Sequence, residues 1–253
     1  MLEINKIYNA DCLEAMKLIP DNSIDMVLCD LPYEISFCKW DKMLDLNLLW
    51  EQYNRIVKEN GAILLFGQQP FTSKLILSNL QNFKYQLIWK KEKPSNVFNV
   101  KYQFGRVHED ICVFYRKQPT YNAQMQKRKV VTNPKPMKGD LNIDISKNVT
   151  GVYKHSKDYD PTLVYPNSVL EFSRDSKKGN PALHPTQKPV ALLEFLIKTF
   201  TNENDLVLDN TAGSCSTAIA CLKTNRNWIM IEKEKEYYDV SLKRIDDFLK
   251  NSK

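Results

Sequence analysis

The chain contains 253 residues, of which 43% are hydrophobic and 26% are charged. These values are typical of a globular protein and exclude a disordered one, and the length suits one large domain with an insertion or two small domains. No apolar stretch approaches the length of a membrane span, and the start of the chain lacks a signal-peptide pattern. We therefore expect a cytoplasmic protein without a membrane partner.

Six cysteines are scattered along the chain without any CxxC pair. Several lie in apolar segments, as expected of reduced, mostly buried thiols. The pattern supports neither a disulfide framework nor a zinc site, and we expect no bound metal.

The formal net charge is +6, and its distribution is uneven. Between Arg116 and Lys188 there are fourteen Lys or Arg residues against six Asp or Glu residues, so the remainder of the chain is slightly acidic. A basic segment attached to a near-neutral body indicates a polyanion-binding surface. A solvated loop in a Lys-rich protein is the alternative.

Hydrophobic periodicity and breaker residues predict strands and helices that alternate along most of the chain. The first half is predicted to contain, in order, strand 4–8, helix 12–19, strand 25–29, helix 46–58 ended by Asn60-Gly61, strand 62–66, helix 69–80, and strands 85–89 and 111–115. After a proline-rich segment, the predicted order continues with helix 190–200, strand 206–208, helix 214–222, strand 228–231 and helix 234–249.

These seven strands predict an α/β fold with a mostly parallel, doubly wound sheet. The main domain would comprise residues 1–115 and 184–253, and the irregular basic segment 116–183 would be an insertion. Two predicted strands lead into an acid, at Asp30 and Asp209. Ligands of such sheets bind outside the carboxyl ends of the strands where the winding reverses, so both carboxylates would face one crevice if their strands flank that point.

The patch Asp30-Leu31-Pro32-Tyr33 directly follows the apolar run Met26 to Cys29. It combines a carboxylate, backbone carbonyls outside the sheet and a flat aromatic ring, which are the groups needed to hold a planar base with an exocyclic amine. The alternative is an ordinary turn at the end of a strand, since Asp and Pro are common turn residues.

The segment from Leu206 to Thr217 is predicted to form a strand, a tight turn at Gly213 and the start of a helix. Free N–H groups from Ser214 to Thr217 would form an anion-holding helix N-terminus, and the absence of a GxGxxG pattern disfavours NAD. Glu232 ends the next strand as an acid suited to a ribose hydroxyl pair, or alternatively as a helix cap. In His184-Pro185-Thr186-Gln187-Lys188-Pro189, Thr186 and Lys188 could meet an anion, or the segment is only a stiff helix lead-in.

In order and content these motifs resemble the β-class, S-adenosylmethionine-dependent amino-group DNA methyltransferases, especially phage-type adenine-N6 enzymes. The family's Asp-Pro-Pro-Tyr motif is similar to Asp30-Leu31-Pro32-Tyr33, and its cofactor loop is similar to the segment from Asp209 to Thr217. The segments that also resemble the family are Ala10 to Leu13, Trp89-Lys90, His108-Glu109 and 184–189. Two residues depart from the pattern, because Leu31 replaces a Pro and Cys215 replaces a Gly.

The resemblance implies S-adenosylmethionine as cofactor and double-stranded DNA as partner. By it, Asp11 and Cys12 would hold the adenine edge of the cofactor and Glu232 its ribose, while Gly213, Ser214 and Lys188 would lie near its methionine portion. Asp209 would shape the pocket floor, and Thr186 is a further candidate for cofactor binding. The Asp30 carboxylate and Leu31 carbonyl would pull on the hydrogens of a target amine, Tyr33 would stack on the ring, and Pro32 would stiffen the frame.

A paired base cannot reach such a pocket, so the target adenine would be flipped out of the helix. The basic insertion 116–183, including Lys127, Arg128 and Lys129, would act as the target-recognition region through phosphate contacts and base readout. Phe37 and Trp40 would line the entrance or pack in the core.

Two other functions remain open at this stage. Cytosine-N4 methylation uses similar chemistry, although its enzymes commonly carry Ser where this chain has Asp30. The other alternative is a DNA-binding relative that has lost methyl transfer. An RNA substrate, a homodimer and a cognate restriction endonuclease are also left open.

Overall fold

The computed structural model describes residues 1–33, 43–128, 160, 162–173 and 187–251. The chain divides into two compact units. The large unit comprises Met1–Asn122 and Ser168–Lys253, and the small unit comprises Ala123–Asn167. The predicted main domain corresponds broadly to the large unit, and the small unit lies inside the predicted insertion 116–183.

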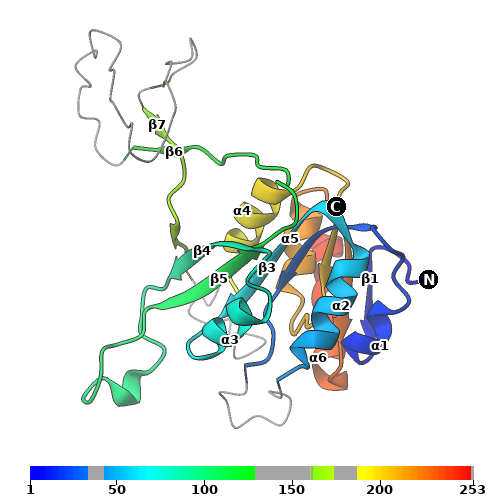
Figure 1. The fold of residues 1–253 in the computed structure, drawn as a ribbon, viewed down its shortest axis with the longest axis horizontal. Helices are drawn as coiled ribbons and strands as arrows, with labels where there is room; N and C mark the ends of the chain where they lie inside the picture. The colour runs from blue at the N-terminus through cyan, green and yellow to red at the C-terminus, as the bar shows by residue number, and fades with distance from the viewer. Residues whose placement is uncertain (34–42, 129–159, 161, 174–186, 252–253) are drawn as a thin grey trace. The chain divides into compact units, whose positions relative to one another are not determined.

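The large unit is built on an eight-stranded sheet with the strand order β1-β10-β9-β2-β3-β5-β4-β8 (Figure 1). Its strands are β1 (Lys6–Asn9), β2 (Ile24–Cys29), β3 (Val57–Gly67), β4 (Phe83–Lys90), β5 (His108–Phe114), β8 (Val169–Glu171), β9 (Leu206–Asp209) and β10 (Asn227–Glu232). All neighbours are parallel except β5, which is antiparallel to both β3 and β4. The predicted mostly parallel α/β sheet is confirmed.

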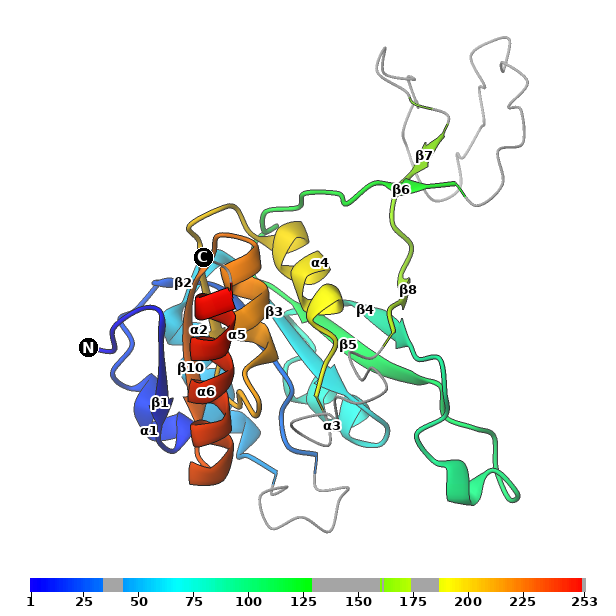
Figure 2. The same cartoon turned by 180° about the vertical axis from the view of Figure 1, so that it is seen from behind.

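Helices cover both faces of this sheet. One face carries α1 (Cys12–Met16), α2 (Leu46–Ile56) and α3 (Phe71–Ser78), and a 3-10 turn, η1 (Val97–Asn99), lies between β4 and β5. Figure 2 shows the other face, covered by α4 (Val190–Phe200), α5 (Ser216–Lys223) and α6 (Lys235–Asn251).

The central strands alternate between two hydrophobic cores because successive side chains of a strand point to opposite faces. In β2, Met26 and Leu28 pack with α4 and α5, whereas Val27 and Cys29 pack with α1 and α2. Both faces of these strands are apolar, as expected for parallel strands buried on both sides. Because both faces are buried, the register between β2 and β9 is fixed, and their carboxyl ends lie side by side.

The winding of the sheet reverses between β9 and β2. Chain-consecutive strands run outward from this point in opposite directions, through β10 on one side and β3 on the other. The carboxyl ends of β9 and β2 therefore flank the crevice in which open α/β sheets bind ligands.

Two local predictions differ from the structure. The sheet has eight strands rather than seven, because β8 pairs with β4 within the predicted irregular segment: Leu170 is buried, and the Trp89 Nε1 donates to the Phe172 carbonyl at 2.9 Å. In addition, α2 passes directly into β3 at Val57, so Asn60 and Gly61 lie within the strand rather than at the end of the helix.

The small unit contains a two-stranded antiparallel sheet of β6 (Gln126–Lys127) and β7 (Leu163–Val164). The Arg128 N–H donates to the Thr162 carbonyl at 2.8 Å and extends this pairing. Across all the residues that the structure describes, no helix is both long and apolar enough to cross a membrane.

Gly61 generates a stability prediction. A Cβ atom there would lie 2.6 Å from the Val57 Cγ1 and 2.9 Å from the Asp25 carbonyl oxygen, and backbone cannot move aside cheaply. We expect Gly61→Ala to lower the free energy of unfolding by about 1–3 kcal/mol, measured by urea denaturation. The exposed neighbour provides the control, Asn60→Ala, and an equal loss in both variants would contradict the steric explanation.

Candidate active site

The structure brings together the two acidic corners that the sequence places far apart. Asp30 follows β2 and Asp209 ends β9, and these strands are paired in parallel with Val27 opposite Leu208. The Thr211 hydroxyl, just beyond β9, donates to the Asp30 carbonyl oxygen at 2.9 Å. The turn after β9 and the patch after β2 are therefore joined by a direct hydrogen bond at the reversal point of the sheet.

The patch after β2 holds its carboxylate between two donors. The Tyr33 hydroxyl donates to the Asp30 Oδ1, and the Lys188 ammonium donates to the Oδ2. Leu31 is buried, and the Tyr33 ring packs against the Phe71 ring with centroids 5.0 Å apart. Burial raises the pKa of Tyr33 well above its usual value, so the side chain remains a neutral phenol that can donate.

Lys188 belongs to a buried chain of alternating charges. Its Nζ lies 3.2 Å from the Glu109 Oε2, and the Glu109 Oε1 also pairs with Lys91. Lys91 follows β4, Glu109 is in β5 and Lys188 precedes α4, so three segments of the chain meet at Asp30. The Lys188 side chain is only 7% exposed, and its Nζ lies 5.0 Å from the centroid of the Phe66 ring.

The pKa values of this cluster follow from burial and from the neighbouring charges. Burial raises the pKa of Asp30, the Lys188 cation opposes that rise, and the Glu109 carboxylate adds to it. Burial alone would raise the pKa of Glu109, but Lys188 and Lys91 hold it below its usual value. Burial alone would lower the pKa of Lys188, but the Asp30 and Glu109 carboxylates raise it. The two carboxylates therefore favour the charged form of Lys188 beside Asp30.

Glu109 and Lys91 are site residues to which sequence reasoning gave no role. The sequence motifs included Glu109 only within the pair His108-Glu109, and they did not include Lys91. The available signal is an acid inside an otherwise buried strand, because Glu109 precedes five buried residues that run to Phe114. Lys188 was expected near the cofactor, whereas it forms ion pairs with the carboxylates of Asp30 and Glu109.

A second carboxylate lies at the end of β10. The Glu232 Oε2 accepts from the Gly213 N–H at 2.8 Å, and the Oε1 accepts from the Glu234 N–H at 2.7 Å. The Gly213 N–H, predicted to approach a ligand, is thus already bonded to Glu232. The φ of +54° at Gly213 favours glycine. Burial raises the pKa of Glu232, and its two backbone donors oppose that rise.

Asp209 is buried beneath the same turn. It accepts from the Thr217 hydroxyl at 2.6 Å and from the Thr211 N–H at 3.2 Å. Burial raises the pKa of Asp209 to about 6, and the threonine donors oppose the rise. These bonds tie the turn to the start of α5.

The turn residues Ser214 and Cys215 are fixed from the side of α6. Arg244 donates to the Ser214 carbonyl at 2.8 Å and contacts the Ser214 Oγ at 3.2 Å. Cys215 adopts a left-handed φ of +57° at the N-cap of α5, which explains why the resembled family has glycine there. Helix α5 accordingly begins at Ser216, two residues later than predicted.

The residue before Asp11 and Cys12 is bonded to Glu232 at the end of β10. The Ala10 N–H donates to the Glu232 carbonyl at 3.2 Å, which places the end of β1 beside the end of β10. The Asp11 Oδ1 caps α1 through the Leu13 N–H at 3.0 Å, and its Oδ2 lies 3.1 Å from the Lys233 Nζ. Cys12 is buried, and burial raises its pKa to about 11, so it is a thiol at neutral pH.

Some predicted residues fall elsewhere. Thr186, Lys129, Phe37 and Trp40 lie outside the described residues. Lys127 and Arg128 belong to the small unit, where Lys127 forms part of β6.

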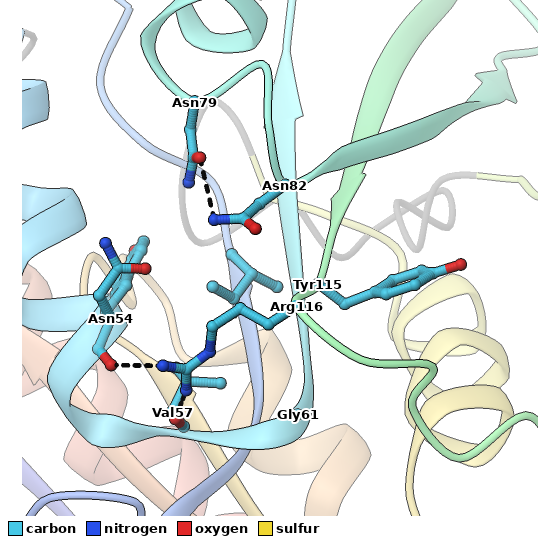
Figure 3. A pocket seen from close by; sticks show the side chains of 9 residues that line it. Asn54, Val57, Gly61, Asn79, Asn82, Tyr115 and Arg116 are labelled. Atoms are coloured by element: carbon cyan, nitrogen blue, oxygen red, sulfur yellow. Dashed lines mark hydrogen bonds between the residues drawn. The ribbon is translucent and has the colours of Figure 1, made fainter.

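A hollow at the other end of the sheet has a structural explanation (Figure 3). Its lining includes residues from the start of β3 and from just after β5, whereas Asp30 lies near the end of β3. Arg116 points into it and donates to the Asn54 carbonyl at 2.9 Å and to the Val57 carbonyl. Arg116 thus satisfies the backbone where α2 passes into β3, and the hollow is separate from the candidate active site.

Fold and site together define an amino-group methyltransferase of the SAM-dependent type, and comparison with known proteins identifies the family. The model of the DNA methylase family (N6/N4 methyltransferases) matches residues 24–243, and the chain belongs to that family.

Relatives and solved structures agree with this assignment. The chain is 28% identical to the DNA adenine methyltransferase YhdJ of Escherichia coli K12, covering 96% of this chain and 83% of the relative. It is 29% identical to the Type II methyltransferase M2.MboI of Moraxella bovis, covering 97% and 90%. The M1.HpyAVI–SAM complex matches with a TM-score of 0.62 and 25% identity over 95% and 98% of the two chains. The cytosine-N4-specific PvuII methyltransferase, at 17% identity and a TM-score of 0.66 over 98% and 92%, shares the fold.

The Lys188–Asp30 pair generates a prediction on pH dependence. Because the Lys188 cation lowers the pKa of Asp30, Lys188→Met should raise it and keep the carboxyl protonated to higher pH. We expect the acidic limb of the pH–rate profile of methyl transfer to move to higher pH, measured with tritiated S-adenosylmethionine.

The matched control is Lys223→Met, which removes a lysine paired with Glu194 in a more exposed ion pair. Melting temperatures of both variants would show that each is folded at the assay temperature. An acidic limb that stays in place in folded Lys188→Met would contradict the role assigned to this ion pair.

Proposed function

We propose that this protein transfers a methyl group from S-adenosylmethionine to the N6 amino group of adenine in double-stranded DNA. The observation that carries the proposal is the arrangement of Asp30, whose carboxylate is held by Tyr33 and Lys188 and whose backbone carbonyl is joined through Thr211 to the turn after β9. The adenine specificity named for YhdJ supports N6 over cytosine N4, as does the Asp at position 30.

The residues around the turn fit this cofactor by their donor and acceptor types. A carboxylate has about four lone-pair sites, so Glu232, with two backbone donors, retains acceptor capacity for a ribose hydroxyl pair. Asp11 supplies a second carboxylate at the same corner, beside the buried Cys12. We assign Asp11, Cys12 and Glu232 to the adenosine part, and Gly213 and Ser214 to the methionine part. Asp209 supports the floor, and Thr186 is retained from the sequence prediction.

The cofactor supplies an electrophilic methyl group on a sulfonium, so the protein needs no metal or strong base for the transfer. The exocyclic amine of adenine is a weak nucleophile because its lone pair is delocalised into the ring. Asp30 and the Leu31 carbonyl would accept its two hydrogens, which localises the lone pair on nitrogen. Asp30 already accepts from Tyr33 and Lys188 but retains lone-pair sites for this bond.

Lys188 supports this role because an ionised carboxylate is a stronger acceptor for an amine hydrogen than a protonated carboxyl group. Burial alone disfavours the charged carboxylate, and the adjacent ammonium counteracts that effect. Glu109 forms a second ion pair with Lys188, and Lys91 pairs with Glu109 in turn. Tyr33 remains the proposed stacking residue, and Pro32 the residue that stiffens its frame.

Asp30→Ala tests the proposal directly. We expect methyl transfer to DNA to fall by about a hundredfold or more, because a positioned polar group at the reacting atom is lost. Cofactor binding, measured by calorimetry, should be retained because the assigned cofactor residues are elsewhere. The control Asp239→Ala removes an exposed aspartate of α6 paired with Lys235. Substantially retained transfer in Asp30→Ala would remove Asp30 from the mechanism.

We further propose that segment 116–183 contains the target-recognition region, with Lys127, Arg128 and Lys129 among its DNA contacts. The excess of positive charge in this part of the chain supports the assignment. The Type II designation of M2.MboI supports a cognate restriction endonuclease as partner.

The double variant Lys127→Ala/Arg128→Ala tests the DNA surface. Each lost phosphate contact should lower the slope of log affinity against log salt by about 1. We therefore expect weaker DNA binding and a flatter slope, measured by fluorescence anisotropy at several salt concentrations. The control Lys6→Ala/Lys17→Ala removes the same charge from lysines at the start of β1 and after α1. If the slopes of the two double variants are equal, the DNA surface lies elsewhere.

A further inference from the structure

The connection between β4 and β5 exposes large hydrophobic side chains. Phe98 is 93% exposed, Tyr102 88% and Phe104 100%, and they are the three most exposed aromatic residues in the described part of the chain. Val97 and Val100, between and beside them, are about half exposed. Exposed apolar side chains that cluster in this way mark a surface that binds something.

This connection, which we call the aromatic loop (residues 93–106), is shaped by its own hydrogen bonds. The Asn96 Oδ1 accepts from the Arg106 N–H at 2.6 Å, and its Nδ2 donates to the Phe104 carbonyl at 3.1 Å. The Ser95 N–H donates to the Arg106 carbonyl at 2.9 Å, and the Tyr102 N–H closes a turn on the Asn99 carbonyl at 2.9 Å. The aromatic rings are thus presented on a preorganised backbone, which lowers the entropic cost of binding.

The aromatic loop emerges from the end of the sheet at which the candidate active site lies. It joins the last residue of β4 to the first residue of β5, and these residues, Lys90 and His108, are paired. Directly beside them, Lys91 and Glu109 belong to the charge cluster that reaches Asp30 through Lys188. Figure 2 shows the loop projecting beyond the ends of β4 and β5.

The charge of the aromatic loop identifies the kind of partner. The stretch from Lys93 to His108 contains no Asp or Glu, and it includes Lys93, Lys101 and Arg106. Aromatic rings interleaved with cations are the composition with which proteins hold unpaired nucleic-acid bases, because every base has a face for stacking and a phosphate for the cation.

We propose that the aromatic loop binds DNA beside the target nucleotide, stacking Phe98, Tyr102 and Phe104 on bases that lose their neighbours when the target leaves the helix. The proposal rests on the proposed function, since only an enzyme that extracts a base creates such unstacked faces. It is independent of the small unit, because the loop belongs to the large unit. The loop would thus stabilise the opened duplex rather than read its sequence.

The test compares two probes with the triple variant Phe98→Ala/Tyr102→Ala/Phe104→Ala. One probe is a mixed-sequence duplex with a short single-stranded gap, which displays unstacked bases, and the other is heparin, a polyanion without bases. Loss of stacking on a single base already corresponds to about tenfold in affinity. We therefore expect the dissociation constant for the gapped duplex to rise at least about tenfold, with heparin binding changed less than about twofold.

The matched control is Leu77→Ala/Leu80→Ala, which removes two exposed leucines near the start of β4, at the other end of that strand. It should bind both probes as the unmodified protein does. All the substituted side chains are exposed, so the melting temperature should not change.

Three results would overturn the proposal: unchanged affinity of the triple variant for the gapped duplex, an equal loss for heparin, or loss of a dimer by light scattering with DNA binding intact. The last result would assign the aromatic loop to a second copy of the chain. The failure of the proposed function has a different signature, namely absence of methyl transfer by the unmodified protein, whereas the loop is tested by binding without turnover.

Discussion

The buried ion pair between Lys188 and Asp30 is the interaction on which the candidate active site depends. Burial by itself raises the pKa of Asp30, and a protonated carboxyl is a poorer acceptor for an amine hydrogen than a carboxylate. The Lys188 ammonium counteracts this effect of burial, Glu109 provides Lys188 with a second carboxylate, and Lys91 pairs with Glu109 in turn. A buried charge is tolerated only when it is paired, so the loss of any one of these four side chains would leave a neighbouring buried charge less well compensated. They also connect the ends of β2, β4 and β5 to the lead-in of α4.

The parallel pairing of β2 with β9 brings the turn after β9 beside Asp30. Asp30 and Asp209 are separated by most of the chain, yet their strands are neighbours at the reversal of the sheet. Thr211 links the two corners by donating to the Asp30 carbonyl, while Glu232 holds the Gly213 turn from the next strand. The residues proposed to hold the target base and those proposed to hold the cofactor therefore lie at the same end of one rigid sheet. Shared rigidity matters because methyl transfer requires the two reactants to be aligned, and positioning is the main contribution that the protein makes.

Several elements could be predicted from the sequence because their signal is local. Helix α4 was predicted with its observed bounds, since its apolar residues recur at helical spacing after Pro189 and before a polar stretch. Strand β8 was missed because three residues carry too little pattern, and it exists because Leu170 is buried beside Trp89. Helix α2 was predicted to reach residue 58, but it ends at Ile56 because β3 begins at Val57, which pairs with Ile24 of β2.

The sequence by itself determined the alternation of strands and helices, the acidic ends of two strands and the motifs that resemble the family. Those features depend on residues close together in the chain. Only the tertiary structure decided which charges meet: it placed Lys188 on Asp30, brought Glu109 and Lys91 behind it, and directed Glu232 onto Gly213. The physical reason is that the Coulomb energy of an ion pair depends on distance and burial, and both are set by strand order and packing rather than by position in the sequence.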